Sequence, residues 1–317
     1  MKLSRFAQYA WGVLFYNVLV ILWGAMVRAT GSGAGCGSHW PLCNGVVVPW
    51  SPAIETMIEF SHRLSSGLAL LLVIGLIIWA FRAYPAGHVI RQGAGAAMLL
   101  MIVESLVGAA LVLFGWVAGD TSTARAIVVP IHLVNTFLLL AAITLTAWWA
   151  SGGLPLRFKG HGWLGGALWA GFIGMLILGA SGGLIALGDT LFPAATFAEG
   201  WEQKFDPNAP FLVQLRAVHP LIAILLGAYI AIIMNLYVNQ SPDPLAKRLS
   251  QLFIGLYTAQ LIVGSFNVVL LAPVWLQIFH LLVTDTLFIL LVLFMAIAFS
   301  QQSAGQSVSK SVGQSVS

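Results

Sequence analysis

The sequence predicts an all-α integral membrane protein with eight transmembrane helices, arranged as two tandem, pseudo-symmetric four-helix bundles. Three observations predict this class. Of the 317 residues, 59% are hydrophobic and only 8% are charged, whereas a soluble domain carries about 25% charged residues. The mean hydropathy is +0.94, and the apolar residues form runs of the roughly 20 residues that cross a bilayer. The chain also repeats itself at a spacing of about half its length.

The first span is the uncharged run 6–27, which follows Lys2 and Arg5 and is too long for the core of a signal peptide. Short loops rich in Gly, Pro or charged residues separate the later spans, which we place at 57–81, 92–117, 125–150, 162–187, 211–238 and 249–271. A tight turn at Ala272-Pro273 leads into the eighth span, which ends near Phe299.

These spans predict three parts of the chain. We expect residues 1–150 to form an N-terminal four-helix half that includes an outer cysteine loop over 28–56, and residues 151–299 to form a C-terminal four-helix half. The tail 300–317 is rich in Ser, Gln and Gly, and a composition of this kind predicts disorder.

The basic residues predict the orientation in the membrane. The net charge is +4, but the basic residues lie in short loops between spans, so we expect membrane lipid rather than nucleic acid as their surroundings. With the N-terminus inside, nine basic residues lie on the inner side and five on the outer side. The inner set is Lys2, Arg5, Arg82, Arg91, Arg157, Lys159, Lys247, Arg248 and Lys310, and the outer set is Arg28, Arg63, Arg125, Lys204 and Arg216. This excess predicts that both termini are cytoplasmic, and that the cysteine loop and the acidic segment 188–210 face outward.

Near-constant offsets relate the two halves. They predict two units with the same orientation, related by an axis along the membrane normal, and the shorter link between the last two spans accounts for the smallest offset. The matched pairs are Gly24-Ala25 with Gly179-Ala180 at 155, Glu104…Gly108 with Gln260…Gly264 at 156, His62 with His219 at 157, and His132 with His280 at 148.

Four histidines share one depth in the even-numbered spans. They are His62, His132, His219 and His280, about five to eight residues into their spans, or roughly 7–12 Å below the outer helix ends. A lone histidine in a span can be a packing residue. Four at one depth, two per repeat, instead indicate a functional site, because ionisable groups in a membrane are costly. Imidazole is a common axial ligand of haem iron, so we predict one bis-histidine haem site in each half. Zinc is less favoured, because it requires further ligands around each pair.

Three stretches carry a specific resemblance. They are Gly31-Ser32-Gly33-Ala34-Gly35-Cys36, Trp40-Pro41-Leu42-Cys43 and Glu59-Phe60-Ser61-His62-Arg63, and they resemble the haem A synthase family over nearly the whole chain apart from the tail. The resemblance implies a bacterial-type enzyme in the cell membrane that oxidises the pyrrole-ring methyl of haem O to a formyl group, giving haem A for terminal oxidases. It implies that His62 and His132 hold the substrate haem O and that His219 and His280 hold haem b as cofactor.

The resemblance also singles out Glu59 and the two cysteines. Glu59 matches the essential carboxylate of the family and, one helical turn from His62, suits a base or a group that stabilises positive charge at the methyl carbon. The competing interpretation is an interfacial carboxylate paired with Arg63 or Arg28. Cys36 and Cys43 lie on the expected outer side, where a disulfide can persist. We interpret the disulfide as a structural staple, with a redox role as the weaker alternative.

The chain departs from the family pattern at three points. It has no second cysteine pair in the outer loop of the second half, Asn44 follows Cys43 where a histidine is often found, and Pro220 follows His219 where Arg63 follows His62. The second site therefore loses a basic residue suited to a haem propionate, a role that Arg216 could take.

Two carboxylates inside the spans are left over. Glu104 aligns with Gln260, so a polar contact between helices is its simplest role, with proton transfer as the runner-up. We expect Asp285 to hydrogen-bond to Thr284 or to a neighbouring helix.

Two other functions fit parts of the pattern. A di-haem b-type cytochrome that only passes electrons accounts for the four histidines but does not call for Glu59 or the cysteine loop. A transporter accounts for the repeat, but transporter repeats are often inverted and carry broken helices. As partners we expect haem O synthase and the assembly factors of terminal oxidases, and a homo-oligomer is compatible with the sequence.

Overall fold

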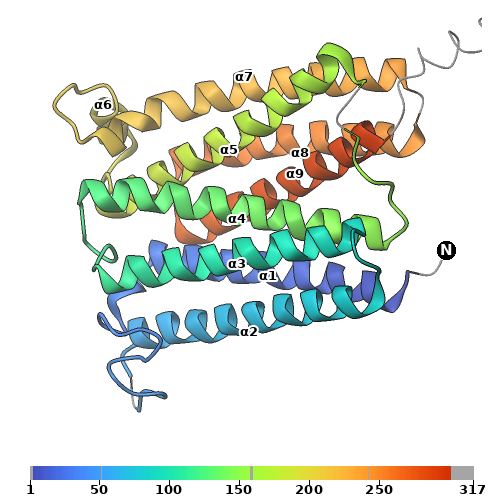
Figure 1. Cartoon of the computed structure of the whole chain (residues 1–317). Helices are drawn as coiled ribbons and strands as arrows, with labels where there is room; N and C mark the ends of the chain where they lie inside the picture. The colour runs from blue at the N-terminus through green and yellow to red at the C-terminus, as the bar shows by residue number, and fades with distance from the viewer. Residues whose placement is uncertain (1–2, 51, 158–159, 242, 301–317) are drawn as a thin grey trace, which may run out of the picture.

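The fold is all-helical, with eight helices long and apolar enough to cross a membrane (Figure 1). The computed structural model describes residues 3–50, 52–157, 160–241 and 243–300. The eight spans are α1 (Arg5–Ala29), α2 (Ile54–Ala83), α3 (Val89–Leu113), α4 (Thr123–Ala150), α5 (Gly162–Leu191), α7 (Phe211–Gln240), α8 (Pro244–Val269) and α9 (Val274–Ser300). The predicted fold class, an all-α protein with eight spans, is confirmed. Of the predicted tail, Ser300 ends α9 and residues 301–317 lie outside the described residues.

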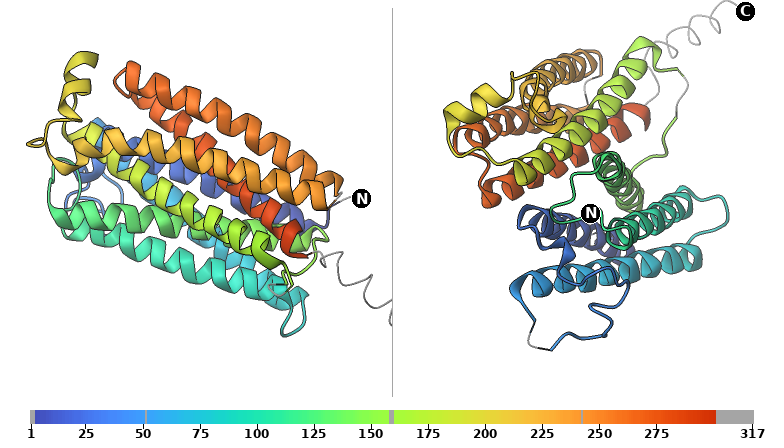
Figure 2. Two further views of the ribbon diagram at one scale, coloured as in Figure 1. Left: turned by 90° about the horizontal axis from the view of Figure 1, so that it is seen from above. Right: turned by 90° about the vertical axis from the view of Figure 1, so that its left-hand side faces the viewer.

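The spans form two groups of four. Within the first group, α1 contacts α2, α2 contacts α3, α3 contacts α4, and α4 returns to α1. Within the second, the same cycle runs through α5, α7, α8 and α9. The end-on view in Figure 2 shows these groups side by side. The groups meet where α1 and α4 pack against α5 and α9, so α4 and α9 are the most buried spans.

Two short helices lie in the connections at one end of the bundle, which we call the outer end. The 3₁₀ helix η1 (Ser32–Ala34) lies in the cysteine loop, and α6 (Phe197–Gln203) lies in the acidic segment before α7. Both are at the end of the bundle opposite the N-terminus (Figure 1). The sequence analysis did not find α6, because its seven residues are too few to show a helical repeat of apolar positions.

Two spans end earlier than expected, and in the same way. The helix α3 stops at Leu113 rather than at residue 117, because Gly115 takes a positive φ of 70° and the Trp116 N–H donates to the Leu111 carbonyl at 2.8 Å. In α8, Leu271 takes a φ of 57° and the Ala272 N–H donates to the Asn267 carbonyl at 2.6 Å. This closing bond is the one expected where a left-handed residue ends a helix. In contrast, α5 continues to Leu191, four residues beyond its expected end.

Aromatic rings fill the interface between the two groups. Phe137 of α4 and Phe288 of α9 lie 4.9 Å apart by ring centroid, and Phe288 is 5.3 Å from Phe172 of α5. The Phe137 ring also lies against the backbone of Gly179 on α5, where a Cβ atom would collide with it. Small residues of this kind let helices approach closely in a membrane, where packing rather than hydrophobicity drives association.

One buried arginine crosses the same interface. Arg28, in the last turn of α1, donates to the Ala186 carbonyl at 2.5 Å and to Thr190 Oγ1 at 3.0 Å on α5, and to Gln277 Oε1 at 3.0 Å on α9. A hydrogen bond to a charged group contributes about 1.5–3 kcal/mol. The three bonds of Arg28 therefore stabilise the contact between the two groups.

Candidate functional site

The first histidine pair lies between α2 and α4. His62 is eight residues and His132 nine residues from the first residue of its helix, and each ring faces a glycine on a neighbouring helix. A Cβ atom at Gly24 of α1 would lie 3.0 Å from His62 Cε1, and one at Gly108 of α3 would lie 3.8 Å from His132 Cε1. A larger side chain at Gly24 would therefore displace the His62 ring.

The second pair repeats this arrangement between α7 and α9. His219 is eight residues and His280 six residues from the first residue of its helix. A Cβ atom at Gly182 of α5 would lie 3.1 Å from His219 Cε1, and one at Gly264 of α8 would lie 3.2 Å from His280 Cε1. Gly182 faces His219 as Gly24 faces His62, so Gly182 is the structural counterpart of Gly24. Gly179, the counterpart expected from the sequence, packs against Phe137 instead. The sequence offset missed Gly182 because the two glycines are three residues apart on one face of α5.

All four histidines lie at one depth. They are six to nine residues from the outer ends of their helices, which corresponds to about 9–14 Å. The glycine partners were not predicted as part of the site, although three of them served to align the repeat. Their signal is a glycine in the helix that precedes each histidine, repeated between the halves at a nearly constant offset, 158 from Gly24 to Gly182 and 156 from Gly108 to Gly264.

The ring nitrogens suit a haem iron. His62, His132 and His280 each have a buried Nδ1 without a hydrogen bond, whereas His219 Nδ1 bonds Ser181 Oγ at 2.8 Å. No Nε2 atom of the four makes a hydrogen bond within the described residues, and none is among the buried unpaired atoms, so all four Nε2 atoms are free to bind a metal. A haem iron needs only two axial ligands from the protein, and one pair of imidazoles can supply them. Zinc needs four ligands, and no group of three His, Cys, Asp or Glu residues occurs in the described part of the chain.

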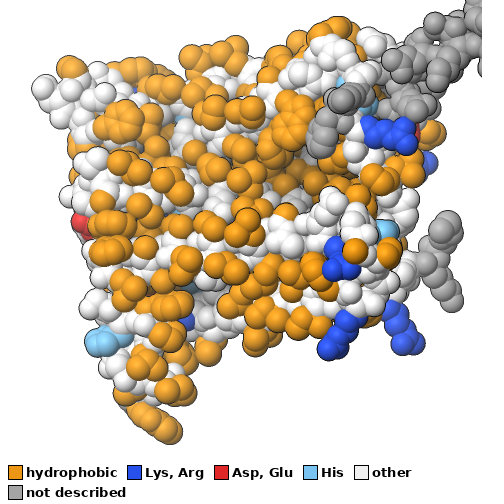
Figure 3. All heavy atoms as spheres, viewed as in Figure 1, with side chains coloured by type: hydrophobic (Ala, Val, Ile, Leu, Met, Phe, Trp, Pro, Cys, Tyr) orange, Lys and Arg blue, Asp and Glu red, His pale blue; other side chains and the backbone are white. Residues whose placement is uncertain are grey.

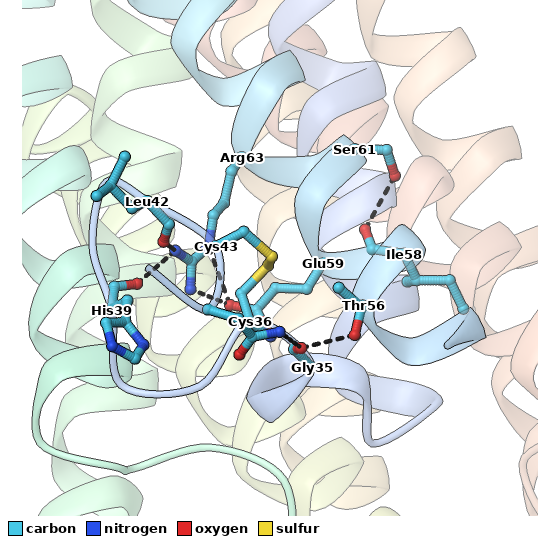
Figure 4. Close-up of a disulfide and its surroundings, with 11 residues drawn as sticks. Gly35, Cys36, His39, Leu42, Cys43, Thr56, Ile58, Glu59, Ser61 and Arg63 are labelled. Atoms are coloured by element: carbon cyan, nitrogen blue, oxygen red, sulfur yellow. Dashed lines mark hydrogen bonds and ion pairs between the residues drawn. A yellow bond between two sulfur atoms is a disulfide. The ribbon is translucent and has the colours of Figure 1, made fainter. Parts of the chain in front are cut away.

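A closed cysteine loop lies over the outer end of the first group. Cys36 and Cys43 form a disulfide (Figure 4), as predicted. Thr56 Oγ1 donates to the Gly35 carbonyl at 2.7 Å. The Gly35 backbone lies so close to α2 that a Cβ atom would be 2.5 Å from the Glu55 carbonyl. The loop is therefore held against the first turn of α2, just above His62.

Glu59 and Arg63 fasten this loop. The Glu59 side chain is 4% exposed, and it accepts hydrogen bonds from the Cys36 N–H at 2.8 Å and from Arg63 Nε at 3.0 Å. A second Arg63 nitrogen also pairs with Glu59 Oε1. Arg63 then donates to the His39 and Leu42 carbonyls at 2.5 and 2.6 Å, and Figure 4 shows the Glu59 and Arg63 side chains beside the disulfide. Of the two pairing partners expected for Glu59, the structure selects Arg63.

The second group closes its outer end differently. Arg216 Nε donates to Asp189 Oδ1 at 2.7 Å, and another nitrogen of the same guanidinium donates to the Phe192 carbonyl at 2.8 Å. Weaker contacts at 3.4 Å reach Gln203 and the Gly188 carbonyl. Arg216 therefore ties the outer loop to α7 through its two shorter hydrogen bonds.

The expected partner of Asp285 is wrong. Asp285 is fully buried, and neither carboxylate oxygen has a hydrogen bond within the described residues. The Thr284 hydroxyl instead donates to the His280 carbonyl at 2.9 Å, one turn back in its own helix. A helical threonine commonly satisfies its hydroxyl in this way.

The fold and the site define a class: a multi-pass helical membrane protein with one histidine pair in each group of four spans. Comparison with known proteins gives the family. Residues 7–292 match the COX15-CtaA model, described as cytochrome oxidase assembly protein, and the chain belongs to this family.

Three relatives illustrate the similarity. A protein named heme A synthase from Exiguobacterium sibiricum is 31% identical over 251 residues, which cover 79% of this chain and 78% of the relative. Another heme A synthase, from Alkalihalophilus pseudofirmus, is 42% identical over 128 residues, which cover 40% of each chain. A Thermus thermophilus protein named protoheme IX farnesyltransferase is 55% identical over 289 residues, which cover 91% of this chain and 48% of the relative. The chain thus spans about half the length of the Thermus relatives it matches.

The histidine–glycine contacts make a prediction for each pair. Gly24→Val should displace His62 and lower the haem content of the first group only, and Gly264→Val should do the same to His280 in the second. Haem per protein, measured on the purified variants, should fall from about two toward one in each.

Each variant has a matched control on its own helix. Gly12 of α1 and Gly255 of α8 have no atom within 4 Å of a built Cβ atom, so Gly12→Val and Gly255→Val should keep normal haem content. An unchanged haem content in both test variants would show that the glycine contacts are unimportant for the site.

Proposed function

We propose that this protein is a haem A synthase that oxidises the pyrrole-ring methyl of haem O to a formyl group, making haem A for terminal oxidases. One observation carries the proposal: two histidine pairs lie at one depth with free Nε2 atoms, and only the first has a buried glutamate and a closed disulfide loop directly above it. Membership of the COX15-CtaA family and the relatives named heme A synthase support the same conclusion.

The two halves of the chain have different tasks in this proposal. His62 and His132, in the half formed by residues 1–150, bind the iron of the substrate haem O. His219 and His280, in the half formed by residues 151–299, bind haem b as the resident cofactor. The asymmetry of the outer ends supports this division, because Arg216 stands three residues before His219 where Glu59 stands three before His62.

The reaction defines what the residues must do. Converting a methyl to a formyl group with oxygen from water consumes one water and releases four protons and four electrons. Side chains cannot take up these electrons. A haem held by His219 and His280 would accept them one at a time and pass them to an external electron acceptor. His62 and His132 position the substrate, and the disulfide loop limits the access of water to the outer side of the site.

Glu59 is the proposed catalytic residue. Its carboxylate suits stabilisation of positive charge at the methyl carbon better than proton transfer, because Arg63 and the Cys36 N–H already occupy its oxygens. In an apolar site a fixed charge has a large effect on the barrier. The same contacts make the Cys36–Cys43 disulfide a structural staple, since the loop that it closes holds Glu59 in place.

We further propose that both termini are cytoplasmic. The described basic residues at the end that carries the N-terminus, such as Arg82 and Arg91, are on the surface, and Figure 3 shows basic side chains gathered at that end. Most outer arginines are instead bound within the protein, as Arg28, Arg63 and Arg216 are. This distribution follows the positive-inside rule and puts the disulfide on the oxidising side.

Haem O synthase and the assembly factors of terminal oxidases are the proposed partners. The Thermus relatives, of which this chain spans about half, bear the name protoheme IX farnesyltransferase. Farnesylation of protohaem IX is the step that gives haem O. An enzyme of that kind is therefore the natural source of the substrate, and a terminal oxidase is the destination of the product.

Pigment analysis tests the proposed reaction. The protein expressed with a source of haem O should yield haem A in the extracted pigments, and His62→Ala should abolish it. His88→Asn should leave conversion intact, because His88 caps α3 and asparagine caps helices well. Recovery of b-type haem with unconverted haem O would favour a di-haem electron carrier, and the absence of any haem would exclude both functions.

The role of Glu59 has its own test. Glu59→Gln should keep both haems but lower haem A formation by at least roughly 100-fold, as expected for a lost electrostatic contact, so that haem O or an alcohol intermediate accumulates. Glu55→Gln is the matched control, because Glu55 is exposed in the first turn of the same helix. A normal yield of haem A from Glu59→Gln would rule out the catalytic role.

A further inference from the structure

The second ring nitrogens of the histidine ligands have different surroundings in the two halves. In the first half, Glu104 of α3 reaches across to α4, and its Oε1 lies 3.4 Å from His132 Nδ1. His132 Nδ1 makes no hydrogen bond, but this contact places a carboxylate directly beside the ring. The proposed iron-binding atom, Nε2, is on the other side of the same imidazole.

Neighbouring side chains hold this carboxylate in place. Asn135 Nδ2 donates to Glu104 Oε2 at 2.7 Å and also to the Leu100 carbonyl at 2.9 Å. The Thr136 hydroxyl lies within hydrogen-bonding distance of Glu104 Oε1 and of the His132 carbonyl. Both oxygens of Glu104 are therefore engaged by α4, the helix that carries His132.

The second half has a similar set of hydrogen bonds beside its histidine, but no carboxylate. Gln260 of α8 takes the place of Glu104, and its Nε2 donates to the His280 carbonyl at 2.9 Å and to Thr284 Oγ1 at 2.7 Å. At the offset of 148 that relates His132 to His280, Thr136 corresponds to Thr284, but Asn135 corresponds to Val283. The glutamate and the asparagine that supports it are thus replaced together, by an amide and an apolar residue. His280 Nδ1 has no hydrogen bond within the described residues, and His219 Nδ1 meets only the uncharged hydroxyl of Ser181, at 2.8 Å.

We infer that Glu104 is a positioning residue that makes His132 a more strongly electron-donating ligand than its counterpart His280. The reduction potential of the first-half haem would then lie below that of the second-half haem. A carboxylate beside the Nδ1–H of a ligating histidine raises the basicity of the ring. A more basic ligand stabilises oxidised iron, and hydrogen bonding around axial ligands is a main control of haem potential. Electrons would then leave the substrate half for the second half, in the direction that the oxidation of haem O requires. This inference rests on the proposed haem sites.

A redox titration of the purified, haem-loaded protein tests the inference with two reciprocal variants. Glu104→Gln should raise the potential of one haem and leave the other unchanged. Gln260→Glu should lower the potential of the other haem. We expect each shift to correspond to about a tenfold change in the reduction equilibrium, or roughly 59 mV for a one-electron couple. Ser105→Ala, on the same helix as Glu104, should change neither potential.

A purely structural role for Glu104 gives a different result. If the residue only joins α3 to α4, Glu104→Gln changes thermal stability and leaves both potentials where they were, which overturns the inference. If Glu104→Gln loses its haem, the shift in Gln260→Glu decides, and an unchanged potential there also overturns it. Unchanged potentials with normal haem A formation would leave the proposed enzyme intact, whereas a protein without haem would contradict that function itself.

Discussion

Four imidazole rings held at one depth inside an apolar bundle are the constraint on which the rest of the structure depends. An ionisable group at this depth is costly unless it has a partner. Here each ring lies against a glycine of the neighbouring helix, and two of the rings also have a polar side chain beside Nδ1, which is Glu104 for His132 and Ser181 for His219. The glycines leave room for the rings and the Nε2 atoms stay free of hydrogen bonds. In the proposed function, a haem held between the two rings of each pair would be that partner, because a haem needs only two such ligands.

The two groups of spans solve the same packing problem but differ at the points that matter for chemistry. Above the first pair, Glu59 and Arg63 hold a disulfide-closed loop. Above the second, Asp189 and Arg216 hold the loop that contains α6. Beside the rings, Glu104 in one half is replaced by Gln260 in the other. The two groups thus share one helix arrangement, and the first group alone has the carboxylates Glu59 and Glu104 at these positions. This asymmetry suits the proposed reaction, in which the first half converts the substrate and the second carries electrons. Arg28 joins the halves near their outer ends and keeps the two sites in a fixed relation.

Most of the fold was predictable, because spans depend on hydropathy and length alone. Helix ends were less so. Residues 114–117 are apolar enough to continue α3, and only the left-handed turn at Gly115 stops it. The short helix α6 carries no repeat that a sequence pattern could reveal. The four histidines and the disulfide were predictable from spacing and resemblance, but the partners of single side chains were not. Either Arg28 or Arg63 could have been the pairing partner of Glu59. Arg28 instead bonds α5 and α9, and no local sequence pattern encodes the packing of those helices around it. Asp285 was expected to be paired, yet its neighbour Thr284 bonds within its own helix.

Haem stoichiometry of paired histidine variants tests the central claim most directly. The intact protein, supplied with haem, should bind about two haems with bis-histidine spectra. The double variant His219→Ala/His280→Ala should keep one haem in the first half, and His62→Ala/His132→Ala should keep one in the second. Loss of both haems from either double variant, or no loss from one of them, would contradict the existence of two independent bis-histidine sites.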